Sequence, residues 1–191
     1  MIDLIIKNGR IVDGSGLAAY VGDIAIENGR ICKLGKVTAE AAHTVDAAGK
    51  VVAPGFIDPH THFDAQLLWD GACKPALEHG VTTVVPGNCS LSLAPLKAEH
   101  RTKLVGMFNQ IEEMPLKAFA EGVTWDWQTF PEFVERISRD LTINVAPLVG
   151  HSVLRLWVMG DAAMERTATA DEISAMQALL RECLDAGAVG M

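Results

Sequence analysis

The chain has 191 residues, of which 49% are hydrophobic, and a formal net charge of −8. This length and composition fit a globular protein with one domain, or with one large and one small domain. Acidic and basic residues are interspersed without a basic run, which argues against nucleic acid or an anionic membrane as a partner. A small neutral or anionic substrate is compatible with this charge.

The first residues and the cysteines indicate a cytoplasmic protein. The stretch "MIDLIIKNGR" has a short apolar run with no basic segment before it, unlike a secretory signal. No later stretch reaches the roughly 18 uninterrupted apolar residues that a membrane span requires. The four cysteines, Cys32, Cys73, Cys89 and Cys183, lack the dense spacing of a disulfide framework, so we expect reduced thiols.

Residues 1–53 are predicted to form a small β domain. Asn8-Gly9 and Asn28-Gly29 each lie between runs rich in β-branched residues, and Asn-Gly supplies the positive φ angles of a type I′ hairpin turn. We therefore predict a hairpin at each pair. Two hairpins bury too little apolar surface, so this domain is not expected to be stable alone.

From Pro54 onward, strands alternate with longer helical stretches. The strand candidates are "VVAPGFID", "GVTTVVPG", "INVAPLVG" and "AGAVGM". Helices are predicted over 101–114, 129–141 and 169–187, and the last two begin with Thr and Glu three residues apart, the spacing of a capping box. This order is typical of βα units around a parallel sheet.

The repeated order predicts the start of a (β/α)8 barrel. A whole barrel takes roughly 250 residues. Residues 54–191 therefore account for the first four βα units, and the fold class is α/β, with a small β domain followed by half of a TIM-type barrel. We expect the barrel to be incomplete.

His60 and His62 are the strongest candidates for chemistry. They follow the strand "GFID", at the end where barrel enzymes keep their active sites. Side chains two residues apart in an extended chain point to the same face, so both imidazoles are placed to bind one divalent metal such as zinc. The alternative is a chance His-x-His in a surface loop, and the position after a buried strand favours the metal.

Other polar side chains follow the same strands. Cys89 ends the second strand, where it is either a metal ligand or, as most free cysteines are, a small buried hydrophobe. His151 ends the third strand and is interpreted as structural or substrate-facing. Asp58 and Asp64 flank the histidine pair and are candidates to orient the imidazoles, although Asp58 equally suits a strand end that accepts backbone donors.

Three stretches together resemble the amidohydrolase superfamily: "IIKNGRIVDGSG", "GDIAIENGRI" and "VVAPGFIDPHTHFD". The continuation "GVTTVVPGNCSLSLAP", "LVGHSVLR" and "LLRECLDAGAVGM" is similar to the N-acyl-D-amino-acid deacylase branch, known as D-aminoacylases. The resemblance covers essentially the whole chain. It implies a small β-sandwich joined to a metal-bearing (β/α)8 barrel.

The resemblance also implies a chemistry. His60 and His62 match the family's first metal pair, and Cys89 matches the cysteine that this branch uses as a zinc ligand. The implied reaction is zinc-dependent hydrolysis of the amide of an N-acyl-D-amino acid. The family's further metal histidines and its general acid and base would lie beyond Met191, so the chain is expected to be the N-terminal fragment of such an enzyme, inactive alone, with self-association through its open barrel edge as one consequence.

Two alternatives stay open. One is another cyclic-amide hydrolase, such as a hydantoinase or dihydroorotase, which commonly bridges its metals with a carboxylated lysine; no lysine stands at a plausible strand end here. The other is a non-catalytic half-barrel that binds a partner through its open edge. Such a module would not need His60, His62 or Cys89.

Overall fold

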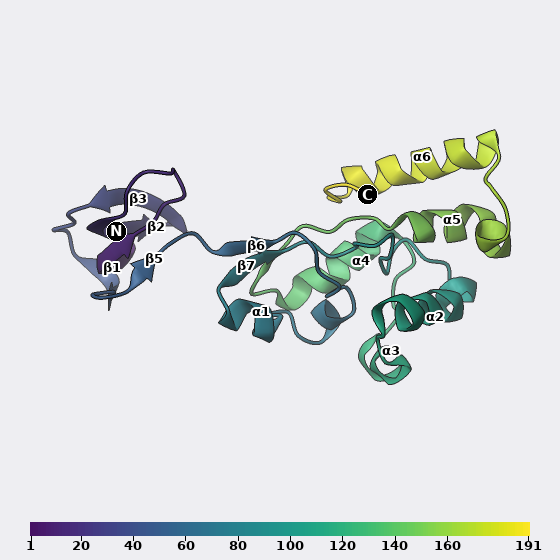
Figure 1. Cartoon of the computed structure of the whole chain (residues 1–191), viewed down its shortest axis with the longest axis horizontal. Coiled ribbons are helices and arrows are strands. Elements are labelled where there is room, and N and C mark those ends of the chain that lie inside the picture. The colour runs from purple at the N-terminus through teal and green to yellow at the C-terminus, as the bar shows by residue number, and fades with distance from the viewer. The chain divides into compact units, whose positions relative to one another are not determined.

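The computed structural model describes residues 1–191 as two units, Met1–Gly55 and Phe56–Met191. The first unit is one five-stranded sheet (Figure 1). Its strands β3, β2, β1 and β4 lie in that order, and β5 pairs with β1. Neighbours β1, β2 and β3 are antiparallel, whereas β4 and β5 run parallel to β1. The strands are β1 (Ile2–Ile11), β2 (Tyr20–Glu27), β3 (Arg30–Gly35), β4 (Ala41–Asp46) and β5 (Val51–Val52).

The two Asn-Gly pairs of this unit have different structures. Asn28 and Gly29, with φ angles of 52° and 70°, join β2 to β3, so the second predicted hairpin is confirmed. The hairpin predicted at Asn8-Gly9 is wrong, because β1 continues through Asn8 with only a shift of register between Ile6 and Gly9. The backbone N–H of Asn8 donates to Asp23 and its side chain donates to Asp46, each over 3.0 Å. These bonds hold a bulge where the local sequence favours a turn.

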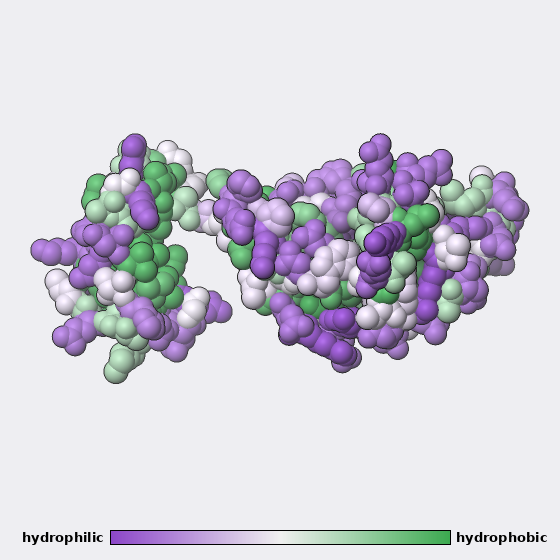
Figure 2. All heavy atoms as spheres, turned by 90° about the horizontal axis from the view of Figure 1, so that it is seen from below, coloured by the Kyte–Doolittle hydropathy of each residue, from purple (hydrophilic) through white to green (hydrophobic).

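The core of the first unit is small. Ile5, Ala25 and Val37 are its central buried side chains. Other apolar side chains gather on one face of the unit (Figure 2), where they surround a hollow of about 290 Å³. That hollow is lined by Ile6, Ile11, Val12, Asp13, Ile24, Ile26, Ile31, Leu34, Val52, Ala53 and Pro54.

Parallel strands form the centre of the second unit. β6 (Phe56–Asp58), β7 (Val81–Val84) and β8 (Asn144–Val145) pair in chain order, and Leu148 forms a further parallel bridge with Gly190. All four predicted strand positions therefore hold parallel backbone. The stretch "VVAPGFID" is not one strand, however, because Val51–Val52 pairs with β1 and only Phe56–Asp58 pairs with β7. Pro54 and the following glycine separate the two pieces.

Helices connect these strands. The three predicted helices are confirmed as α2, α4 and α6, and both predicted capping boxes are present, Thr129 with Glu132 and Thr169 with Glu172. Three others were missed. None of the helices combines the length and apolar character needed to cross a membrane. The bounds are α1 (Lys74–Glu78), α2 (Arg101–Glu112), α3 (Leu116–Gly122), α4 (Phe130–Ile137), α5 (His151–Met159) and α6 (Ala170–Asp185), with 3₁₀ turns at Gln66–Leu68, Ala98–His100, Ser138–Asp140 and Gly160–Met164.

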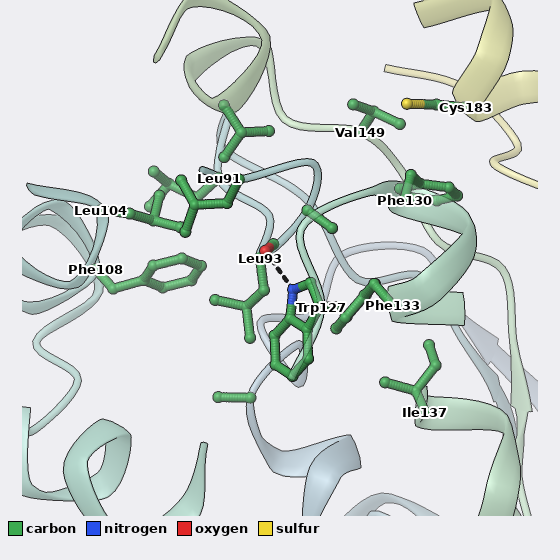
Figure 3. Packing of buried hydrophobic residues seen from close by; sticks show 14 of the residues in the cluster. Leu91, Leu93, Leu104, Phe108, Trp127, Phe130, Phe133, Ile137, Val149 and Cys183 are labelled. Carbon is green, nitrogen blue, oxygen red and sulfur yellow. Dashed lines mark hydrogen bonds between the residues drawn. The ribbon is translucent and has the colours of Figure 1, made fainter. Parts of the chain in front are cut away.

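The core of the second unit brings distant segments together (Figure 3). Leu91 and Leu93, after β7, pack with Leu104 and Phe108 of α2, and all four are almost completely buried. The indole N–H of Trp127, which is 3% exposed, donates to the carbonyl oxygen of Leu93 over 3.0 Å. This core holds the segment that begins at Leu91. It thereby fixes the position of Cys89 and Ser90, which immediately precede that segment.

Candidate metal centre

The histidine pair lies in the loop that follows β6. β6 ends at Asp58, so His60 and His62 follow the strand, as the sequence predicted. Their ring centroids are 5.5 Å apart, at an interplanar angle of 62°. His60 is exposed and His62 is partly buried. The loop therefore holds both imidazoles close together without the alternation of a strand.

Cys89 comes from the loop after β7. Cys89 and Ser90 have φ angles of 54° and 67°, so two successive non-glycine residues occupy the left-handed region, which is unfavourable for residues with a Cβ. The side-chain amide of Asn88 donates to the carbonyl oxygens of Val85, at 2.7 Å, and of Pro59, at 3.4 Å. The second bond links this loop to the loop of the histidines.

The two loops bring three donor atoms together. Nε2 of His60 lies 3.2 Å from Sγ of Cys89, and the ligand atoms of His60, His62 and Cys89 all lie within 4.8 Å of one another. Imidazole nitrogen and thiolate sulfur are the donors that zinc prefers. The residues present therefore fit a zinc ion by their chemistry and by their convergence.

A fourth side chain lies at the cluster, and no sequence pattern predicted it. Oε2 of Glu112, the last residue of α2, lies 3.3 Å from Nε2 of His62, and the side chains of His62 and Glu112 are 20% and 19% exposed. Nδ1 of His62 is buried without a hydrogen-bond partner. The contact with Glu112 is thus the polar interaction that holds this ring. A glutamate at the end of an amphipathic helix gives no signal in sequence.

Acidic groups shape the electrostatics of the cluster. Burial, and to a smaller extent the charge of Glu112, raises the pKa of Asp64 to about 7. Loss of hydration and the Glu112 carboxylate also raise the pKa of the Cys89 thiol. A bound cation opposes such shifts, because a coordinated thiol is deprotonated outright.

The two aspartates that flank the histidines contact backbone instead of the imidazole rings. Asp58 accepts a hydrogen bond from the backbone N–H of His60 over 3.2 Å. Asp64, 2% exposed, accepts one from the backbone N–H of Gly87 over 3.2 Å. Their hydrogen bonds therefore fix the course of the two loops, and the predicted bonds to the rings are not formed.

His151 is the first residue of α5 and is exposed. It shares with Cys89 the wall of a cavity of about 260 Å³. The other lining residues are Gly87, Asn88, Ser90, Leu148, Val149 and Met191. Nothing in the spacing predicted α5, since its N-cap is Gly150, which makes no side-chain cap. The cavity offers space for a small molecule beside the donor cluster.

Two glycines allow the strand ends around this cavity to approach. A Cβ added at Gly150 would overlap the carbonyl group of Ser90, and one at Gly87 would overlap the carbonyl group of Leu148. The loop of Cys89 and the start of α5 are also joined by hydrogen bonds from Ser152 N to the backbone oxygen and to Oγ of Ser90, each 3.1 Å.

The remaining cysteines have other surroundings. Cys73 and Cys183 are buried, and loss of hydration raises the pKa of each to about 11. Cys32 is exposed, and its thiol donates to the carbonyl oxygen of Ala25 over 3.4 Å. Cys89 is thus distinguished by its two histidine neighbours.

Comparison with known proteins gives concordant results. Residues 43–191 match the amidohydrolase family. The chain is 39% identical over 191 residues to a D-aminoacylase of Alcaligenes xylosoxydans xylosoxydans, an alignment that covers 99% of this chain and 37% of that protein. The chain therefore spans little more than a third of the length of this relative.

Solved structures match this chain over a similar share of their own length. A D-aminoacylase structure from a study of its binuclear metal centre superposes with a TM-score of 0.83 at 39% identity, over 100% of this chain and 38% of that one. The N-acyl-D-glutamate deacylase of Bordetella bronchiseptica, in complex with zinc and a phosphonate mimic of the tetrahedral intermediate, gives 0.81 at 37% identity, over 99% and 37%. The fold is that of the N-terminal portion of these TIM-barrel proteins.

Proposed function

Since the chain belongs to the amidohydrolase family, we propose that it carries the first part of a zinc centre that hydrolyses the amide bond of N-acyl-D-amino acids. The observation that carries this proposal is the convergence of His60, His62 and Cys89, whose ligand atoms lie within 4.8 Å of one another. A zinc ion bound there would polarise the acyl carbonyl and lower the pKa of a bound water.

The residues of the chain have separate roles in this proposal. His60 and His62 supply neutral imidazole donors, and Cys89 supplies a thiolate. The strained backbone at Cys89 and Ser90 keeps Sγ directed at the histidines, 3.2 Å from Nε2 of His60. Strain of this kind persists only where surrounding contacts maintain it. We assign no proton transfer to a residue of this chain.

The substrate assignment rests on the relatives and on the cavity. The relatives named above are a D-aminoacylase and an N-acyl-D-glutamate deacylase, both of which act on N-acylated D-amino acids by name. The cavity that His151 shares with Cys89 adjoins the proposed metal. We propose that His151 faces the substrate from α5, and that Cys89, which must stay reduced to bind metal, works in the cytoplasm.

The first test is zinc content per chain, measured by elemental mass spectrometry on the purified protein. We expect about one zinc per chain, lost in the double variant His60→Ala/His62→Ala and in Cys89→Ser. His43→Ala and Cys32→Ser are matched controls, since both residues are exposed and lie outside the cluster. Zinc retained in the double variant would refute the proposed centre.

A second test addresses the substrate class. Calorimetric titration of the zinc-loaded protein with N-acetyl-D-methionine is expected to give binding that its L enantiomer does not. His151→Ala is expected to weaken binding of the D enantiomer without changing the zinc content, because this side chain lines the cavity but is not among the clustered donors. Equal affinity for both enantiomers would contradict the assignment to D-amino acids.

A further inference from the structure

Glu112 is positioned at the donor cluster by an element that carries none of the three donors. It ends α2, whereas His60 and His62 follow β6 and Cys89 follows β7. Its Oε2 atom is 3.3 Å from Nε2 of His62, and its side chain is 19% exposed. The carboxylate is thus largely removed from solvent and directed at a candidate ligand.

The charge of Glu112 has no cationic side chain to balance it. Among the ion pairs of the protein, Glu112 takes part only in that with His62, and no Lys or Arg reaches it. Removing a carboxylate from water is costly unless an opposite charge or several donors compensate. A divalent cation would supply the missing charge.

The location of the carboxylate also decides between two roles. A carboxylate that only orients a ligating histidine binds the ring nitrogen that faces away from the metal. Glu112 contacts Nε2 of His62, whereas Nδ1 of the same ring is buried without a partner. A metal held by Nε2 of His62 would therefore have the Glu112 carboxylate on its own side of the ring, and not behind it.

We propose that Glu112 is a fourth protein ligand of this metal centre, an inference that rests on the proposed function. Zinc binds four donors in a tetrahedron and accepts carboxylate oxygen beside nitrogen and sulfur. His60, His62 and Cys89 fill three positions, and Glu112 supplies an oxygen donor from α2. Metal binding then ties α2 to the loops after β6 and β7.

The test compares Glu112→Gln with Glu113→Gln, which removes the same charge from the exposed neighbouring residue. Zinc affinity is measured by competition with a chromophoric chelator, and coordination by the visible spectrum of the cobalt(II)-loaded protein. We expect Glu112→Gln to lower the affinity by about tenfold or more and to change the cobalt d–d bands, with the thiolate-to-cobalt charge-transfer band of Cys89 retained. Glu113→Gln should match the unmodified chain.

Two results would overturn the inference. Unchanged affinity in Glu112→Gln would exclude a ligand, and lowered affinity with unchanged d–d bands would make Glu112 a positioning residue. If circular dichroism shows that Glu112→Gln does not fold, Glu112→Ala decides, and spectra and affinity equal to those of the unmodified chain would again overturn it. An unmodified chain that binds no metal would instead refute the proposed centre itself.

Discussion

Nε2 of His60 and Sγ of Cys89 lie 3.2 Å apart, although 29 positions separate them in sequence. The contact joins the loops that follow two neighbouring parallel strands, β6 and β7. Because carboxyl ends of parallel strands meet at one edge of a sheet, a pair of short loops is enough to create it. Several consequences of this arrangement are open to measurement.

Zinc should protect Cys89 from alkylation. In the metal-free protein we expect iodoacetamide to modify the exposed Cys32 and Cys89, while the buried Cys73 and Cys183, whose pKa burial raises to about 11, react slowly. Saturating zinc should suppress modification of Cys89 alone, because a coordinated thiolate is not free to attack. Peptide mass spectrometry measures each site. An unchanged rate at Cys89 would mean that its thiol does not bind the metal.

Acid should weaken the start of α6. Hydrogen bonds, first from Arg166 and then from the backbone of Thr169, lower the pKa of Glu172 from 4.5 to about 2. A group whose pKa is lower in the folded state stabilises above its unfolded pKa, so this contribution should be lost as pH falls from about 4.5 to about 2. Glu172→Gln should flatten that part of the pH profile in urea unfolding, by a modest amount because its partner Arg166 is 47% exposed to solvent.

The Thr169 cap should make its own contribution. Its hydroxyl accepts from the backbone N–H of Glu172 over 3.2 Å, and loss of such a cap costs about 1 kcal/mol of unfolding free energy. Thr169→Ala should show this loss at neutral pH, and Thr169→Ser should retain most of the stability. Equal loss in both variants would assign the effect to the methyl group.

The hydrogen bond of Trp127 should contribute to the free energy of unfolding. Trp127→Phe leaves the buried carbonyl of Leu93 without its 3.0 Å donor, which costs about 1–3 kcal/mol. Trp69, 50% exposed, offers the control, and Trp69→Phe should change the unfolding free energy by less than about 0.5 kcal/mol. Chemical unfolding followed by circular dichroism measures both. Similar losses in the two variants would contradict a special role for this bond.

Substitution by alanine should have opposite effects on stability at two of the glycines. A Cβ at Gly106, in α2, meets no atom within 4 Å, so Gly106→Ala should stabilise the protein by about 0.5–1 kcal/mol. A Cβ at Gly150 would overlap the carbonyl group of Ser90, so Gly150→Ala should destabilise it and also lower zinc affinity by displacing Cys89. Zinc affinity that survives in a folded Gly150→Ala protein would show that the loop absorbs the shift.

Local signals determined what the sequence could predict. The capping boxes at Thr129 and Thr169 and the hairpin at Asn28 are encoded within a few residues, and all three are present. Asn8 has the same local signal, but Asp23 and Asp46, distant in sequence, convert it into a bulge. Tertiary contacts override a turn propensity where they satisfy the same backbone groups.

The same contrast between local signals and distant contacts applies to the candidate site. The positions of His60, His62 and Cys89 after successive strands followed from the strand pattern, and their ligand atoms do converge. Glu112 could not be found, because its approach to His62 depends on how α2 packs through Leu104 and Phe108. When helix packing brings a side chain to a site, no periodic pattern in the sequence indicates that it belongs there.

The donors of the cluster lie on two loops, His60 and His62 on the one after β6 and Cys89 on the one after β7, and this makes the chemistry of the site separable from the stability of the fold. Cys89 is exposed and contributes the only sulfur donor among the clustered residues, so in the proposed centre a preference for a soft metal would rest on this one side chain. Cys89→Asp would present an all nitrogen and oxygen donor set to the same cavity without touching the buried core. A single substitution in this loop would therefore alter which metals the proposed centre prefers while the fold is kept.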